Sequence, residues 1–174
     1  MDIELGLQTV NYHNLVEVNR GHTLAEYIDA VLRIKRYGLS TTAHVILNLP
    51  GDDMLDVIET AKIISTLGVD FVKLHSLYVV GHTELGRRYA AGEFTMITLQ
   101  KYVERVVTFL EYLNPEIVVQ RLVGKGPQDD LLFCNWDTSW WKIKDAIDAE
   151  FIARGSRQGS RFDYLNGRAI RNRR

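Results

Sequence analysis

The sequence predicts an α/β fold built from parallel βα repeats. Short apolar runs typical of strands alternate along the chain with amphipathic stretches typical of helices. Capping residues, glycines and prolines separate most of these runs. Such alternation is typical of a parallel sheet with crossover helices, and it fits both an open doubly wound sheet and part of a (βα) barrel.

The first βα unit has clear start and stop signals. Residues 2–8 alternate between apolar and polar side chains, which predicts a strand, and Asn11 is expected to cap the short helix that follows. Thr23 and Glu26 form a capping box, in which each side chain accepts a hydrogen bond from the other residue's backbone N–H. The helix that they start should end at Gly38.

The second unit begins with a nearly continuous apolar run. By its composition, the run at residues 42–47 predicts a strand that is buried on both faces. Asp52 or Asp53 should cap the next helix, which Gly68 closes. Residues 70–77 then predict the third strand.

The second half of the chain continues the pattern. Residues 98–113 have the apolar spacing of a helix, and Pro115 ends it because proline lacks the backbone N–H. Residues 116–120 predict a fourth strand. A glycine-containing loop is expected at 124–130 and a last helix at 139–154.

A polar residue ends each predicted strand, namely Gln8, Asn48, His75–Ser76 and Gln120–Arg121. Because the carboxyl ends of parallel strands meet at one edge, these side chains should share a rim where a ligand can bind. Solvent exposure alone would also make strand ends polar. Pro50 stops the second strand and Gly51 permits a close approach to a ligand, although an ordinary βα turn has the same needs.

Composition restricts the function classes. The chain is 46% hydrophobic and 25% charged, as globular proteins are, and its net charge of −1 gives no overall attraction to nucleic acid or membranes. Cys134 is the only cysteine, so this chain alone forms no disulfide, no all-cysteine zinc site and no cysteine-bound iron–sulfur cluster. That usage fits a reducing, cytoplasmic location. No apolar run is long enough for a membrane span, and no HxH or HxxxH pair suggests a metal site.

Four motifs, taken in order, carry a resemblance to a known family: IELGLQT, NRGHT, HVILNLPGDD and VKLHSLYVVGHTEL. As a set they resemble the later strands of a radical SAM barrel, most closely that of the YhcC-like proteins, which are relatives of the elongator catalytic subunit. The resemblance implies a partial TIM-like barrel. The family's CxxxCxxC-type loop, whose thiolates hold the 4Fe-4S cluster that binds S-adenosylmethionine, is absent from this sequence.

The resemblance implies a C-terminal fragment of a radical SAM enzyme. The intact enzyme would cleave S-adenosylmethionine at the cluster to form a 5′-deoxyadenosyl radical, with a substrate that is unknown and could be related to RNA. This chain alone is expected to hold neither cofactor and to be inactive. Three segments are expected: residues 1–125 as the C-terminal half of the barrel, 126–153 as a helical extension, and 154–174 as a basic, flexible tail.

The resemblance assigns the cofactor-binding positions to Glu4, Gln8, Arg20, Asn48, Leu49, Pro50, Gly51, Leu77 and Tyr78. The chemistry is suitable, because a glutamate accepts from an ammonium group and an arginine forks onto a carboxylate. The alternatives are an exposed ion pair for Glu4 and Arg20, and core packing for Leu77. No residue is assigned a catalytic role.

Substrate-side candidates are His22, His75, Arg121 and Lys125. A strand histidine such as His44 or His75 is more often a hydrogen-bonded core residue than a ligand, whereas His22 lies between a glycine and a capping threonine. Arg121 and Lys125 could meet an anionic substrate, or belong to a solvated turn. Trp136, Trp140 and Trp141 form either a hydrophobic clasp or a base-stacking platform, and the clasp is the more common use.

A second function class remains open, in which the chain is a cluster-free α/β binding or assembly module. A partial barrel leaves unpaired strand edges, which would pair with a missing N-terminal half or with another copy of the chain. The segment from Arg154 to Arg174 contains seven arginines and a single acid, Asp163, so it could contact RNA phosphates or simply be solvated. No membrane partner is expected.

Overall fold

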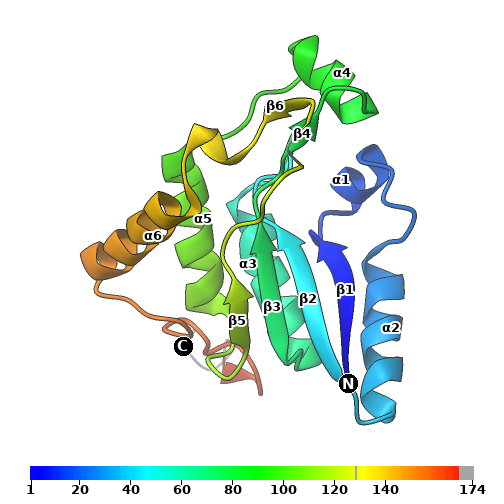
Figure 1. The fold of residues 1–174 in the computed structure, drawn as a ribbon. Coiled ribbons are helices and arrows are strands. Elements are labelled where there is room, and N and C mark those ends of the chain that lie inside the picture. The colour runs from blue at the N-terminus through cyan, green and yellow to red at the C-terminus, as the bar shows by residue number, and fades with distance from the viewer. Residues whose placement is uncertain (128, 169–174) are drawn as a thin grey trace.

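A computed structural model describes residues 1–127 and 129–168. Its centre is a four-stranded parallel sheet with the strand order β1–β2–β3–β5 (Figure 1). The strands are β1 (Asp2–Gln8), β2 (Ser40–Ile46), β3 (Phe71–His75) and β5 (Val118–Arg121). The described strands form an open sheet, and the predicted class, parallel βα repeats that form part of a barrel, is confirmed.

The helices begin and end close to the predicted signals. They are α1 (Tyr12–Glu17), α2 (Leu24–Arg36), α3 (Met54–Leu67), α4 (Glu84–Ala90), α5 (Leu99–Tyr112) and α6 (Trp140–Arg154). Asn11 caps α1, the Thr23–Glu26 capping box starts α2, and Asp53 rather than Asp52 caps α3. No helix in the described part of the chain is long and apolar enough to cross a membrane.

The two faces of the sheet differ. Helices α2, α3 and α5 lie on one side, where Ala43, Val45, Val72 and Leu74 are fully buried, and none of the described helices lies across the other face (Figure 1). His44, Ile46, Lys73 and His75 lie at alternate positions of the same strands and remain half-buried on that open face. The prediction that the second strand is buried on both faces is therefore wrong, because no layer of the described chain covers its second face.

The segment before α4 and the segment after β5 form a small sheet that the sequence did not predict. Strands β4 (Val79–Val80) and β6 (Leu131–Phe133) pair antiparallel above the carboxyl ends of the parallel strands (Figure 1). His82 and Asp130 join the two segments, with Nδ1 of the histidine 2.7 Å from a carboxylate oxygen. Such short strands lack a periodic pattern, so only the tertiary pairing reveals them.

The segment after α6 packs on α5, where the sequence predicts a flexible basic tail. The backbone N–H of Gly159 donates to the carbonyl of Leu110 at 2.9 Å, and the hydroxyl of Tyr164 donates to the carbonyl of Tyr112 at 2.7 Å. Arg161 also pairs with the buried carboxylate of Glu111 at 3.2 Å. The first part of the expected tail is thus docked, while residues 169–174 lie outside the described residues.

Candidate functional site

The carboxyl ends of the parallel strands share one rim, as the strand polarity requires. A depression of about 340 Å³ at this rim is lined by Gln8, His44, Ile46, His75, Ser76, Leu77 and Tyr78. Four residues with an expected ligand role therefore meet here: Gln8 at the end of β1, and His75, Leu77 and Tyr78 at and after the end of β3. Gln8 ends β1 with a φ of 68°, at the point where the register of β1 on β2 shifts. This irregular backbone sets the direction of the Gln8 side chain.

Asn48 lies under the rim rather than in the depression. It is 2% exposed, and its Oδ1 accepts a hydrogen bond from the backbone N–H of Leu77 at 2.6 Å. This bond joins the end of β2 to the end of β3. The Nδ2 of Asn48 is buried and has no hydrogen-bond partner. An unpartnered buried donor is costly, so this atom is a position where a ligand acceptor would add stability.

The turn after Asn48 is held from below by a buried arginine. Arg105 of α5 donates to the carbonyl of Leu47 at 2.9 Å and to the carbonyl of Asp52 at 2.6 Å. The Asp52 carboxylate in turn accepts from Nδ2 of Asn14 at 2.5 Å, and burial raises the pKa of Asp52 to about 6. These contacts make residues 47–52 a rigid support for the rim.

Gly51 is required where it stands. It has a φ of +90°, and a Cβ on this residue would lie 2.5 Å from Oδ1 of Asn14. Its backbone conformation and the space beside it therefore both select glycine. Leu49 is buried and Pro50 half-buried in the same turn, so the expected ligand role of the segment 48–51 would be exercised through Asn48 and the backbone.

Arg20 and His22 lie at the free edge of β1, in a second depression of about 420 Å³ that Glu4 also lines. Arg20 donates from Nη2 to the carbonyl of Gly6 at 3.0 Å, and Nε2 of His22 lies 3.1 Å from the same carbonyl. The Nε of Arg20 is buried without a partner. The structure thus groups Arg20, His22 and Glu4 along one strand edge, apart from the residues at the rim.

A chain of polar side chains crosses the open face. Glu4 accepts from Nζ of Lys73 and from Nε2 of His44, each at 2.6 Å, and Nδ1 of His44 lies 3.1 Å from Nε2 of His75. The hydrogen bonds with Lys73 and His44 lower the pKa of Glu4, so it accepts as a carboxylate. Burial first, and then the nearby charges of His44, Arg121 and Lys73, lower the pKa of His75 to about 4, so this ring is neutral at pH 7.

The hydrogen-bond partners indicate which ring nitrogens of His44 and His75 carry a proton. Because the Glu4 carboxylate only accepts, Nε2 of His44 carries a proton, and in the neutral form of that ring Nδ1 accepts from Nε2 of His75. The lone pair of His75 is left on Nδ1, which faces Gly124 so closely that a Cβ there would lie 2.7 Å away. The chain therefore presents an unprotonated ring nitrogen at the rim.

We expect Nε2–H tautomers for both neutral histidines in ¹⁵N-edited NMR spectra at pH 8. Glu4→Ala should return His44 to a mixture of tautomers, because the carboxylate that fixes its proton is gone, whereas Glu116→Ala, at an exposed glutamate before β5, should change neither ring. An Nδ1–H tautomer of His44 in the unmodified chain would contradict the assigned chain of hydrogen bonds.

Three side chains that this geometry brings forward were not predicted as site residues from the sequence. His44 was expected to be an ordinary core histidine, and neither Lys73 nor Arg105 was singled out. A signal for the first two was present: polar residues occupy every second position at His44, Lys73 and His75, on the face opposite the buried apolar residues. Nothing in the sequence marks Arg105 as the support of the turn, because its partners are backbone carbonyls far along the chain.

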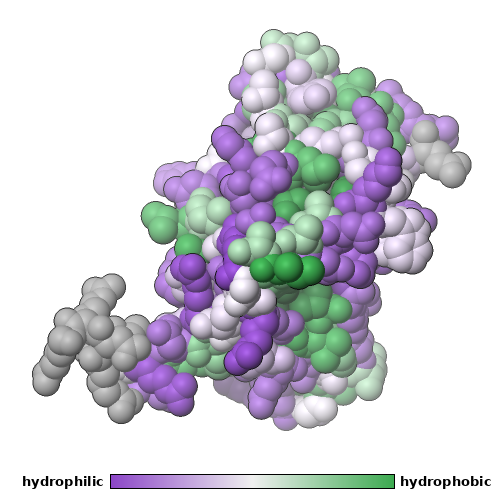
Figure 2. All heavy atoms as spheres, turned by 90° about the vertical axis from the view of Figure 1, so that its left-hand side faces the viewer, coloured by the Kyte–Doolittle hydropathy of each residue, from purple (hydrophilic) through white to green (hydrophobic). Residues whose placement is uncertain are grey.

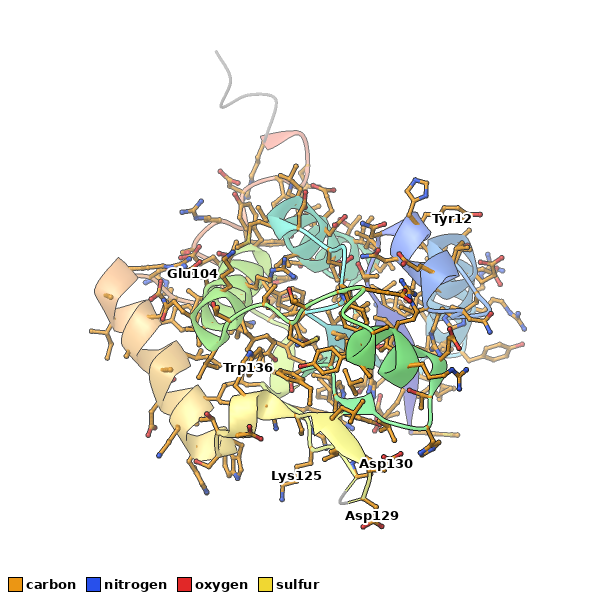
Figure 3. The ribbon with its side chains drawn as sticks, turned by 90° about the horizontal axis from the view of Figure 1, so that it is seen from above. Tyr12, Glu104, Lys125, Asp129, Asp130 and Trp136 are labelled. Atoms are coloured by element: carbon orange, nitrogen blue, oxygen red, sulfur yellow. The ribbon has the colours of Figure 1, made fainter. Side chains whose placement is uncertain are left out.

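The three tryptophans have separate roles. Trp136 is a clasp: its Nε1 donates to the carbonyl of Ile97 at 2.7 Å, and its ring packs on Tyr102 with centroids 5.0 Å apart. Trp140 and Trp141 stack on each other at the start of α6 and stay 39% and 60% exposed. Figure 3 shows Trp136 pointing inward, whereas Lys125 projects outward on the side of β6.

An open parallel sheet, with helices on one face and a polar rim at its strand ends, is the architecture of part of a βα barrel. Residues 69–153 match the family model of the radical SAM C-terminal domain. YtqA of Bacillus subtilis is 33% identical over 94% of this chain and 51% of its own length. The chain belongs to the radical SAM family and corresponds to a YhcC-like C-terminal region.

Two further matches support this. YhcC of Escherichia coli is 30% identical over 80% of this chain and 45% of its own length. The solved structure of archaeal Elp3 from Methanocaldococcus infernus, with its N-terminal 46 residues deleted, superposes with a TM-score of 0.77 over 91% of this chain and 37% of that one. At 21% identity this match shows the shared fold. The chain spans about half the length of YtqA and YhcC.

Proposed function

We propose that this chain forms the C-terminal wall of a radical SAM barrel, and that the intact protein cleaves S-adenosylmethionine at a 4Fe-4S cluster. The observation that carries the proposal is the open polar face of the sheet in a chain of this family. Its strand ends and edge offer two buried donors without partners, Arg20 Nε and Asn48 Nδ2. The cofactor supplies the 5′-deoxyadenosyl radical when it is bound, and this chain binds and orients.

The two expected cofactors fit this chain differently. The cluster does not fit, because Cys134 is the only cysteine and the described residues contain no group of three His, Cys, Asp or Glu side chains that could hold a metal. Its thiolates have to come from sequence outside this chain. S-adenosylmethionine fits, because its carboxylate, ribose hydroxyls and amine match the guanidinium of Arg20, the amide of Asn48 under the rim and the carboxylate of Glu4.

In the proposed arrangement each residue has a limited task. Arg20 binds the carboxylate of the methionine part, and Asn48 with the backbone to Gly51 borders the ribose. Leu77 and Tyr78 lie beside the adenine ring. Glu4 already accepts from Lys73 and His44, so its contact with the amine would be shared with them. Neutral His75 is suited to accept a hydrogen bond on Nδ1 from a substrate at the rim.

The proposal is tested on the longer polypeptide that includes the cysteine-bearing region, reconstituted anaerobically with iron and sulfide. We expect a bound cluster and formation of 5′-deoxyadenosine from S-adenosylmethionine after reduction. A longer polypeptide that holds no iron, yet associates stably with itself or another chain, would instead support the assembly-module alternative, for which the unpaired edges of β1 and β5 provide the surface.

Arg20→Leu in that polypeptide should weaken binding of S-adenosylmethionine about tenfold or more, because a charge-assisted contact to a carboxylate is lost. The iron content should not change, because cysteine thiolates and not Arg20 would hold the cluster. Arg36→Leu removes an equal charge from an exposed position of α2 and should bind normally. Equal weakening in both variants, measured by equilibrium dialysis, would exclude the assigned contact.

A further inference from the structure

A cavity of about 530 Å³ lies between the outer edge of β5 and α6. Its lining combines apolar side chains of the strand end and the helix with three cations and one tryptophan. The volume falls in the range of small-molecule sites, about 300–1,000 Å³. None of the expected cofactor-binding residues lines it.

The charged side chains that line the cavity are all positive. Its cations come from three separate segments: Arg121 ends β5, Lys125 follows in the loop, and Lys144 lies on α6. Lys144 bonds the Asp148 carboxylate at 2.5 Å, whereas Arg121 and Lys125 have no ion pair with any residue in the described ranges 1–127 and 129–168. No acidic side chain lines the cavity. Two cations that line one hollow without an ion pair attract an anion.

The aromatic wall adds a second kind of contact. Trp140 lines the cavity and is 39% exposed, and its ring is stacked on Trp141 with centroids 3.5 Å apart. A tryptophan held in place by its neighbour loses little rotational freedom on binding, so its exposed surface is suited to a planar ring.

The cavity is close to the rim. Arg121 stands opposite Lys73 in the strand register, and its charge is one of the causes that keep His75 neutral. Gly124, next to Lys125, lies so near His75 that a Cβ on it would be 2.7 Å from Nδ1 of the ring. A molecule held by Arg121 and Lys125 would therefore lie beside the carboxyl ends of the strands.

An apolar docking groove is the competing interpretation. A neighbouring hollow shares Val119 and Leu122 with this cavity, and Figure 2 shows hydrophobic surface between polar groups on the side of the molecule that carries α6. A protein partner would have to bury Arg121 and Lys125 without any acid of this chain to pair with them. The cations therefore favour an anionic ligand over an apolar partner.

We propose that this cavity binds a phosphorylated small molecule with a planar ring, of the size of a nucleotide. Arg121 and Lys125 contact the phosphate groups, and Trp140 stacks on the ring. Given the proposed function, this ligand is the anionic part of the substrate, held next to the open face. The binding itself requires no cluster, so it is measurable on the present chain.

The test is isothermal titration of this chain with inorganic pyrophosphate, ADP, adenosine and a short single-stranded oligonucleotide. We expect ADP to bind about tenfold more tightly than pyrophosphate, because stacking on an aromatic ring contributes to affinity, and adenosine to bind more weakly than ADP. Raising the salt concentration should weaken the binding of both pyrophosphate and ADP.

Variants separate the two contacts. The double variant Arg121→Gln/Lys125→Gln should lower the affinity for pyrophosphate at least tenfold. Trp140→Leu should leave the affinity for pyrophosphate unchanged and lower the affinity for ADP to the same level. Arg36→Gln, a charge-matched change on α2, should alter neither. The proposal is overturned if pyrophosphate and ADP both fail to bind, if Arg36→Gln weakens them equally, or if only the oligonucleotide binds. These outcomes concern the cavity alone, whereas failure of the proposed function would appear as a longer polypeptide without a cluster.

Discussion

Asp52→Asn should stabilise the protein at pH 7 and leave its stability near pH 4 almost unchanged. Burial raises the pKa of Asp52 from 3.8 to about 6, so between these pH values the folded state keeps a proton that the unfolded state has released. Stability from this group is therefore present at low pH and is lost as the pH rises through 6. The pKa difference corresponds to about 3 kcal/mol at most, and asparagine keeps the acceptor for Asn14.

His75 acts in the opposite direction over the same pH range. Burial and neighbouring cations lower its pKa from 6.5 to about 4, so here the unfolded state holds the extra proton and stability rises with pH. The two effects offset each other in the unmodified chain. His75→Gln should reveal the fall caused by Asp52, and the double variant Asp52→Asn/His75→Gln should show neither effect.

Urea unfolding monitored by circular dichroism at several pH values between 4 and 7.5 measures these effects. Asp2→Asn is the control, because it removes an exposed carboxylate near the start of β1. If Asp52→Asn and the unmodified chain have parallel stability profiles, the Asp52 carboxyl does not keep its proton on folding, and the assigned burial of this group is wrong.

Arg105→Leu should lower the free energy of unfolding by about 4 kcal/mol. The substitution keeps an apolar stem in α5 but leaves the buried carbonyls of Leu47 and Asp52 without donors, and each hydrogen bond to a charged group contributes about 1.5–3 kcal/mol. Arg36→Leu, at an exposed position of α2, should cost less than about 0.5 kcal/mol.

Hydrogen exchange distinguishes a local effect from general loosening. In Arg105→Leu the amides of residues 47–53 should exchange faster than those of β2 and β3, because the turn loses its support while the strand ladder remains. Uniform acceleration across the sheet, or a loss of stability no larger than in Arg36→Leu, would contradict the assigned role of Arg105.

Several elements could be predicted because their signals are local. The caps at Asn11 and Thr23, and the alternation of residues 2–8, depend on side chains a few positions apart, and the structure confirms them. The short strands β4 and β6 were missed, because two or three residues carry no period and their pairing partners are about 50 positions apart. The family, in contrast, was recognised from a set of four motifs taken in order between residues 3 and 85.

The candidate site shows the same division. The shared rim of Gln8 and His75 followed from parallel strands, whereas the hydrogen bonds from Glu4 through His44 to His75 depend on the strand register. The ligand roles assigned to Arg20, Asn48 and Tyr78 stay predictions. The structure adds that Asn48 supports the rim from below and that Arg20 stands at a strand edge.

By itself the sequence determined the βα order, the helix caps, the polar ends of the strands and the absence of the thiolates that a cluster needs. Only the tertiary structure decided which face of the sheet stays open, how Arg105 supports the turn, and that Arg121, Lys125 and Trp140 line one cavity. The physical reason is distance along the chain. Periodicity and capping act between near neighbours, whereas buried hydrogen bonds and charge clusters join residues that meet only after the strands have paired.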